Sequence, residues 1–180
     1  MKKLILLICV GLLSSGVMAQ KGQFLTTEDF HKLAFPEQEM KWQTLWVNKT
    51  LRAEMEEILN HSVAGLRIRY WGHGQRSAWM FEEIGKELPI TVGVVVEGDS
   101  IDQVHIMEYR ESRGGEVRYP FFTKQFIGVK LAQNAERVKL DSHIDGITGA
   151  TLSVRALKKI ATLALFCHQQ TPFAKTDTSE

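Results

Sequence analysis

The strongest constraint on the fold is a pair of apolar segments joined by a short turn. Residues 90–96 are almost entirely apolar and mostly β-branched, which is typical of a buried strand. Residues 97–100 supply a glycine-containing turn, and residues 104–109 return with alternating apolar and polar side chains. This pattern predicts a β-hairpin with at least one face in the protein core.

Three helices are predicted around this hairpin. Residues 26–29 read Thr-Thr-Glu-Asp and favour the start of a short helix that ends before Pro36. Residues 49–60 and 152–168 carry apolar side chains at helical spacing, which predicts one amphipathic helix in each segment. Residues 66–71 alternate apolar and basic side chains and predict another strand. Antiparallel strands with segregated helices indicate an α+β fold, a single domain with a twisted antiparallel sheet flanked by helices.

Two aromatic clusters have more than one interpretation. Residues 70–74, with Trp79 nearby, are rich in aromatic side chains and glycine. They favour a surface loop, and the alternative is a segment that borders a planar ring. Phe121, Phe122 and Phe126 are predicted to lie in the core, with stacking against a planar ring as the alternative.

The first nineteen residues have the pattern of a secretory signal peptide. A short basic start is followed by an apolar run and by small residues before Gln20. The run is about ten residues long, whereas a membrane-spanning helix needs roughly 20. We therefore expect residues 1–19 to be a signal peptide that exports the chain to the periplasm or another extracytoplasmic compartment, with an uncleaved anchor as the alternative. The expected domain then covers residues 20–171, with its core at 88–168 and a polar tail at 172–180.

Charge and cysteine content exclude several classes of function. The formal net charge is +1, and the expected leader removes two lysines, so no nucleic-acid partner is predicted. Cys167 is the only cysteine outside the leader, so an intramolecular disulfide is excluded and stability must come from packing. The six histidines show no ligand spacing, and no metal site is predicted.

The segment that carries chemistry is residues 145–151, directly before the last predicted helix. Gly146 and Gly149 permit left-handed backbone angles and leave the main chain uncovered. Thr148 and Thr151 each suit the N-cap position. Because a helix N-terminus presents unpaired N–H groups and partial positive charge, these residues predict an anion near Thr151. The alternative is an ordinary glycine turn and helix cap.

This segment resembles the flavinylation motif of FMN-binding domains, Asp-x-x-[Ser/Thr]-Gly-Ala-[Thr/Ser], which is found in the FMN-carrying subunits of the Rnf and Nqr complexes. Its defined positions are met by Asp145, Thr148, Gly149, Ala150 and Thr151. The resemblance implies that the hydroxyl of Thr151 carries FMN covalently through a phosphoester, with the other four residues as further members of the cofactor site. In that family a Mg²⁺-dependent flavin transferase of the ApbE type attaches FMN from FAD, with AMP as the leaving group, so such a transferase is an expected partner.

A second resemblance lies upstream of the motif. The family carries a signature close to Glu-Thr-Pro-Gly-Leu-Gly, followed by Gln-Phe-x-Gly. Residues 111–116 read Glu-Ser-Arg-Gly-Gly-Glu and residues 125–128 read Gln-Phe-Ile-Gly. The resemblance implies that Glu111, Ser112 and Gly114 belong to the cofactor site. Arg, Gly and Glu replace the family's Pro, Leu and last Gly, so a plain charged turn is the alternative for this loop.

Together these observations predict an exported flavoprotein that carries electrons between redox partners, such as a cytochrome or a membrane reductase. A flavin exchanges one or two electrons, and attachment through the phosphate leaves its ring free. No dinucleotide-binding fingerprint accompanies the motif, so an electron carrier is favoured and no catalytic residue is assigned. The membrane anchor that the resemblance to the respiratory subunits implies is not found, so a free-standing soluble member of the family is expected. Two alternatives stay open, namely a flavin-dependent reductase of a small acceptor, such as a metal chelate or quinone, and an interaction module that never becomes flavinylated.

Overall fold

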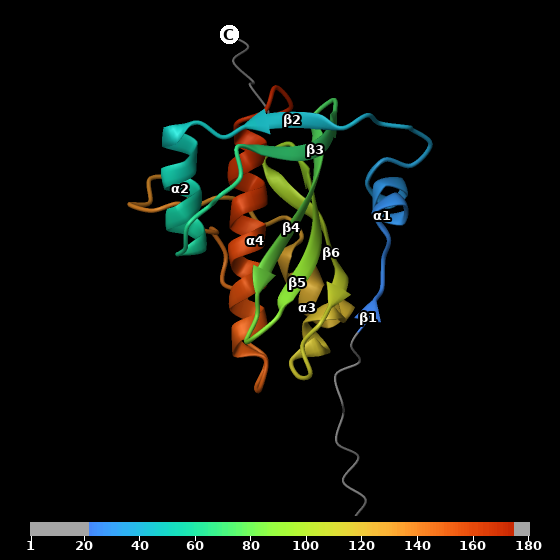
Figure 1. The fold of residues 1–180 in the computed structure, drawn as a ribbon, viewed down its shortest axis with the longest axis vertical. Coiled ribbons are helices and arrows are strands. Elements are labelled where there is room, and N and C mark those ends of the chain that lie inside the picture. Colours follow the sequence, from blue (N-terminus) through green and yellow to red (C-terminus); the bar gives the residue numbers. More distant parts are fainter. Residues whose placement is uncertain (1–21, 175–180) are drawn as a thin grey trace, which may run out of the picture.

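The computed structural model describes residues 22–174, and its centre is a single antiparallel sheet (Figure 1). The strands are β1 (Gly22–Gln23), β2 (Gln43–Trp46), β3 (Arg67–His73), β4 (Arg76–Ile84), β5 (Pro89–Glu97) and β6 (Ser100–Tyr109). Their order across the sheet is β1-β6-β5-β4-β3-β2. The strands from β2 to β6 therefore form a meander, and β1 adds to its β6 edge. The predicted signal peptide, residues 1–19, lies outside the described residues.

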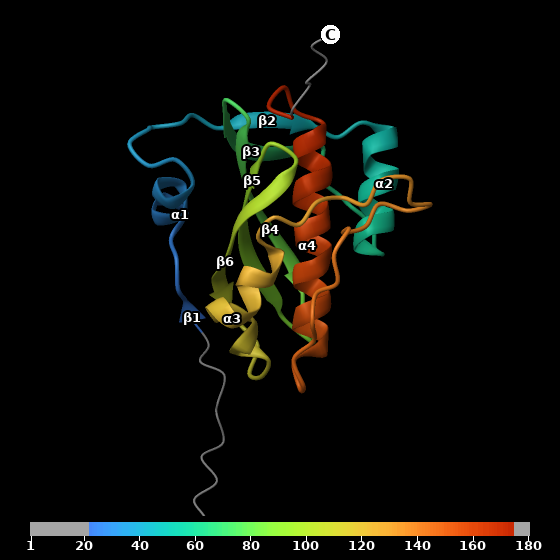
Figure 2. The ribbon, with the colours of Figure 1, turned by 180° about the vertical axis from the view of Figure 1, so that it is seen from behind.

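Helices cover both faces of this sheet. They are α1 (Thr27–Ala34), α2 (Lys49–Leu59), α3 (Pro120–Thr123) and α4 (Thr151–Gln169), with short 3₁₀ helices η1 (Gly115–Arg118) and η2 (Lys124–Phe126). Helix α4 lies along one face with α2 beside it, whereas α1 lies on the opposite side (Figures 1 and 2). The α+β prediction is confirmed. Between residues 22 and 174, none of the helices combines the length and the apolar character that a membrane crossing requires.

The predicted hairpin is confirmed and forms the centre of the core. Strands β5 and β6 pair antiparallel, and Val94 lies opposite Val104. Side chains of β5 alternate between the two sheet faces, because Val94 packs in the α4 cluster while Val95 packs in the α1 cluster. A Cβ atom at Gly93 would lie 2.6 Å from the ring of Phe30, so glycine at this position lets α1 approach the sheet.

The surface-loop interpretation of residues 70–74 is wrong. Most of this segment belongs to β3, where Tyr70 and Trp71 are buried. Tyr70 lies opposite Trp79 of β4, and the two rings stack with centroids 4.5 Å apart. Trp79 is completely buried. The aromatic residues therefore fill the core because an unpredicted strand, β4, pairs with them.

The second aromatic cluster is only partly in the core. Phe122 and Phe126 are completely buried, as predicted, but Phe121 is 62% exposed. Phe121 and Phe122 are neighbours in the one-turn helix α3, so their side chains leave it in different directions. In the part of the predicted polar tail that is described, Phe173 contacts the ring of Tyr70 and packs against the core.

A buried hydrogen-bond chain joins the end of α4 to the sheet. The Trp79 indole N–H donates to Ser77 Oγ over 2.7 Å. The Ser77 hydroxyl lies 2.6 Å from His168 Nδ1, and His168 Nε2 lies 2.8 Å from the Gly98 carbonyl. Because a carbonyl can only accept, Nε2 carries the proton and Nδ1 accepts from Ser77. Burial disfavours the charged imidazole and lowers the pKa of His168.

This chain predicts a loss of stability in acid. A histidine whose pKa is lower in the folded than in the unfolded protein stabilises the fold above its unfolded pKa of about 6.5. That contribution disappears as the pH falls from there through the folded pKa. We expect the free energy of unfolding, measured by urea titration between pH 7.5 and pH 5, to fall more steeply in the wild type than in His168→Asn, which keeps an acceptor near the Nδ1 position. Parallel pH profiles would contradict the assignment.

Candidate functional site

The beginning of α4 differs from the sequence-based expectation in one respect. Ala150 is the N-cap residue, and no side chain caps the helix, so the prediction that Thr148 or Thr151 caps it is wrong. The chain turns just before the helix, where the Ala150 N–H donates to the Ile147 carbonyl and Gly149 adopts a φ of +85°. Thr151 is consequently the first helical residue, and its side chain is exposed. The N–H groups of the first turn are left without a side-chain acceptor.

The loop after β6 packs directly against this first turn. Gly114 has a φ of +80°, and a Cβ atom there would lie 2.8 Å from Ser153 Oγ and 3.3 Å from Ala150 Cα. The Tyr109 hydroxyl joins the two segments, since it donates to the Arg113 carbonyl and lies 2.9 Å from Ser153 Oγ. The absence of a side chain at Gly114 is therefore what allows the loop to contact the helix start.

Glu111 fixes the neighbouring β4–β5 turn. Its Oε1 accepts hydrogen bonds from the backbone N–H groups of three consecutive residues, 86, 87 and 88, at 2.5 to 3.0 Å. Burial by itself would raise the pKa of this carboxyl, but the three N–H donors outweigh it and the pKa is lowered. Glu111 is therefore held ionised, and it connects the upstream loop to the turn between β4 and β5.

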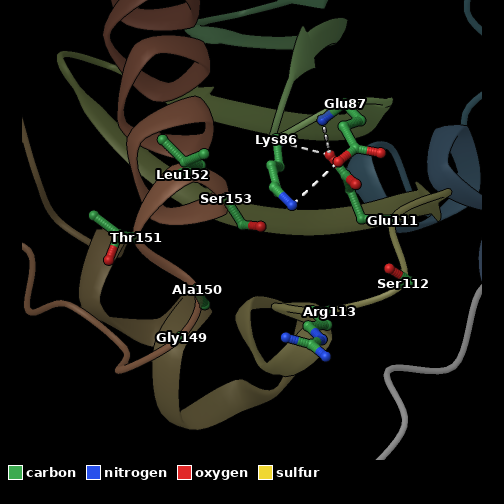
Figure 3. A pocket seen from close by; sticks show the side chains of 10 residues that line it. All are labelled: Lys86, Glu87, Glu111, Ser112, Arg113, Gly149, Ala150, Thr151, Leu152 and Ser153. Carbon is green, nitrogen blue, oxygen red and sulfur yellow. Dashed lines mark hydrogen bonds and ion pairs between the residues drawn. The ribbon is translucent and has the colours of Figure 1, made fainter.

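These segments enclose a pocket of about 590 Å³ (Figure 3). It is lined by Lys86, Glu87, Glu111, Ser112, Arg113, Gly149, Ala150, Thr151, Leu152 and Ser153. Thr151 lies at one edge, with Glu111 and Ser112 across the pocket from it. Lys86 and Ser153 extend into the space between these edges.

The structure brings together most, but not all, of the predicted site residues. Thr151, Gly149 and Ala150 line the pocket together with Glu111 and Ser112 of the upstream loop. Gly114 does not line the pocket, but it lies against the start of the helix at Ala150 and Ser153. Asp145 and Thr148 do not line the pocket, and both are exposed.

The second upstream signature supports the motif from outside the pocket. Gln125 Oε1 accepts a hydrogen bond from the Asp145 N–H over 2.7 Å. Phe126, the next residue, is completely buried. The buried phenylalanine thus anchors the glutamine, which in turn holds the beginning of segment 145–151.

Five lining residues were not in the predicted site, namely Lys86, Glu87, Arg113, Leu152 and Ser153. Ser153 lies two residues beyond the motif, so its place in the first helical turn was accessible from the sequence. Lys86 and Glu87 reach the pocket because β5 pairs with β6, with Ile90 opposite Tyr109. That pairing places the turn before β5 beside the loop after β6. No local pattern in the sequence signals it.

Comparison with known proteins assigns this part of the chain. The fold is an α+β domain whose pocket lies at the start of a long helix. The family model described as FMN-binding domain matches residues 85–165. This span includes every residue that lines the pocket. The chain therefore contains an FMN-binding domain of this family, over residues 85–165. A search of curated proteins finds no significant match.

The residues present fit FMN. The exposed first turn of α4 offers N–H groups and partial positive charge to a phosphate, and Gly149 leaves the backbone beside it uncovered. Lys86 and Arg113 add two cationic side chains to the same pocket. Within residues 22–174, no group of three or more His, Cys, Asp or Glu side chains is arranged to hold a metal ion.

The contact at Gly114 can be tested with a matched glycine. Gly114 and Gly128 have φ angles of +80° and +81°, but a Cβ atom at Gly128 would meet no atom within 4 Å. Both alanine variants incur the left-handed backbone penalty of about 1–2 kcal/mol, whereas only Gly114→Ala also crowds Ser153 and Ala150. We expect Gly114→Ala to lower the free energy of unfolding by about 1–3 kcal/mol more than Gly128→Ala. Equal decreases in the free energy of unfolding of the two variants, measured by urea titration, would contradict this expectation, because the loop at Gly114 would then accommodate the methyl group without a loss of stability.

Proposed function

We propose that this protein is an exported electron carrier that holds FMN covalently through a phosphoester on the Thr151 hydroxyl. The observation that carries the proposal is the place of Thr151, a residue with an exposed side chain at the rim of the pocket and in the first turn of α4. Its hydroxyl makes no hydrogen bond to any other described residue. A transferase can therefore reach this oxygen without first breaking an interaction.

Electrostatics favour a phosphoester at this position. A phosphodiester retains one negative charge, which the N-terminal end of α4 stabilises. Arg113 has no hydrogen-bond or ion-pair partner for its guanidinium among residues 22–174, so its charge is available to the pocket. Lys86 pairs with Glu87 over 3.1 Å, and both side chains are exposed, so this pair is weak and can rearrange. The flavin ring supplies one- and two-electron chemistry, and the protein holds and orients it.

The ionisable groups of the pocket favour a carrier over an enzyme. Three backbone N–H groups hold Glu111 ionised, so its carboxylate cannot donate a proton near neutral pH. The other ionisable side chains of the lining are Lys86, Glu87 and Arg113, all exposed. The pocket is therefore suited to holding a redox group and not to activating a substrate.

The compartment and the partners follow from the sequence-based part of the proposal. The leader-like residues 1–19 support export, and an ApbE-type flavin transferase would meet the folded chain outside the cytoplasm. The transferase would join Thr151 Oγ to the FMN phosphorus of FAD, and AMP would leave with the oxygen of the broken pyrophosphate bond. A cytochrome or a membrane reductase is the kind of redox partner that such a carrier serves.

The attachment can be tested by intact mass. Co-expression with an ApbE-type transferase should add the mass of one FMN, less one water, to the wild type and to Thr151→Ser, which keeps a hydroxyl. Thr151→Ala should gain no mass and stay colourless. Thr123→Ala, which removes a threonine outside the motif and outside the pocket, should be modified like the wild type. Modification of Thr151→Ala, or none on the wild type, would contradict the proposal.

The carrier role predicts a particular kinetic behaviour. When the chemically reduced, flavin-loaded protein is mixed with a ferric chelate or a water-soluble quinone in a stopped-flow instrument, the oxidation rate should rise linearly with acceptor concentration. A binding site for the small acceptor would instead make the rate saturate. Saturation that is abolished by a lining variant such as Arg113→Gln would favour the reductase.

A further inference from the structure

A second hollow lies on the other side of Thr151. It is a groove of about 540 Å³ between α4 and the segment before it. It is lined by Ile58, Val138, Lys139, Leu140, Ser142, His143, Ile144, Gly146, Thr151, Val154, Arg155, Lys158, Lys159 and Thr162. Thr151 lines both this groove and the pocket. The residue is therefore the ridge between the two.

The groove carries positive charge that the fold does not neutralise. Its lining contains four Lys or Arg residues and no Asp or Glu. Among residues 22–174, the side chains of Lys139, Arg155 and Lys158 make no hydrogen bond or ion pair. Arg155 and Lys139 are exposed and Lys158 is half-buried. The whole chain has a formal net charge of only +1, so this concentration of unpaired cations is local to the groove.

Lys159, the fourth cation of the groove, has a structural role. Lys159 Nζ donates to Glu83 Oε1 over 2.8 Å, and Glu83 also lies 2.8 Å from His61. Glu83 is buried, so this cluster fastens α4 to β4 and to the end of α2. No comparable partner accounts for Lys139, Arg155 or Lys158.

Two of the three unpaired cations, Arg155 and Lys158, are aligned with Thr151 along one face of α4. Thr151, Arg155, Lys158 and Thr162 follow one another at intervals of four, three and four residues, which places them on the same side of a helix. The opposite side of α4 packs in the core through residues such as Leu157 and Ile160. The face that begins at Thr151 thus carries two unpaired cations, the exposed Arg155 and the half-buried Lys158, and becomes buried at Thr162.

We propose that this groove docks a partner protein through a carboxylate-rich segment and so directs that partner to Thr151. Charge complementarity selects acidic groups. The apolar side chains of Ile58, Leu140 and Val154 in the same hollow suit the hydrocarbon parts of a peptide segment. Membrane-surface helices bury an outward-facing apolar face in the lipid, whereas these apolar side chains line a hollow. The role assigned to the partner, exchange of electrons with a flavin on Thr151, rests on the function proposed above. The docking itself does not.

The test uses the protein before flavin attachment, with a fluorescein-labelled peptide of Glu and Leu residues as the probe. Binding measured by fluorescence anisotropy at low salt should weaken steeply as salt is added. The double variant Arg155→Gln/Lys158→Gln should bind roughly tenfold more weakly, because exposed ion pairs each contribute modestly. The charge-matched control Lys32→Gln/Lys41→Gln removes two exposed lysines, one in α1 and one in the segment between α1 and β2, and should bind like the wild type.

Three outcomes would overturn the proposal. Equal loss in both double variants would mean that only net charge matters. Tighter binding of anionic phospholipid vesicles than of the peptide, with the same dependence on Arg155 and Lys158, would assign the groove to a membrane. A shifted flavin absorption spectrum in the groove variants of the loaded protein would place the flavin itself in the groove. Because the peptide measurement needs no flavin, failure of flavin attachment to Thr151 would leave its result intact.

Discussion

The pocket depends on one close contact, the approach of the Gly114 backbone to the first turn of α4. A side chain at this position would collide with Ser153 and crowd Ala150, so the loop after β6 could not close over the helix start. The Tyr109 hydroxyl secures the contact from within the core, and Glu111, three residues earlier in the loop, fixes the turn that completes the wall. Thr151 is consequently held at the rim by the sheet and not by the helix alone.

Much of the fold could be predicted, because its periodic segments are also its most buried ones. Residues 90–96 form an apolar, β-branched run, residues 104–109 alternate between apolar and polar side chains, and the apolar face of α4 has helical spacing. Strand β4 escaped prediction because Arg76–Ile84 mixes polar, aromatic and acidic residues without a regular period. Tyr70 and Trp71 lie in a strand, as predicted for residues 66–71, but the surface-loop interpretation of residues 70–74 missed their burial, which depends on pairing with that strand.

The site likewise combines residues that a local motif identifies with residues that only the pairing of distant strands brings together. Thr151 and Gly149 were identified from a contiguous motif and do line the pocket. Lys86 is brought there only by the pairing of β5 with β6, which no local pattern reports. The capping role expected for Thr148 or Thr151 failed because the turn at residues 147–150 makes Ala150 the N-cap and Thr151 the first helical residue. That shift leaves the Thr151 hydroxyl without an internal partner, which is the condition that an attachment residue requires.

The most direct measurement is the mapping of the flavin to one side chain in the protein purified after co-expression with the transferase. Trypsin should release residues 140–155 as one peptide, which contains four hydroxyl groups, at Ser142, Thr148, Thr151 and Ser153. We expect tandem mass spectrometry to place FMN on Thr151 alone. Attachment to Thr148, which lies outside the pocket, or to Ser153, whose hydroxyl is bound to Tyr109, would contradict it, as would a peptide without FMN.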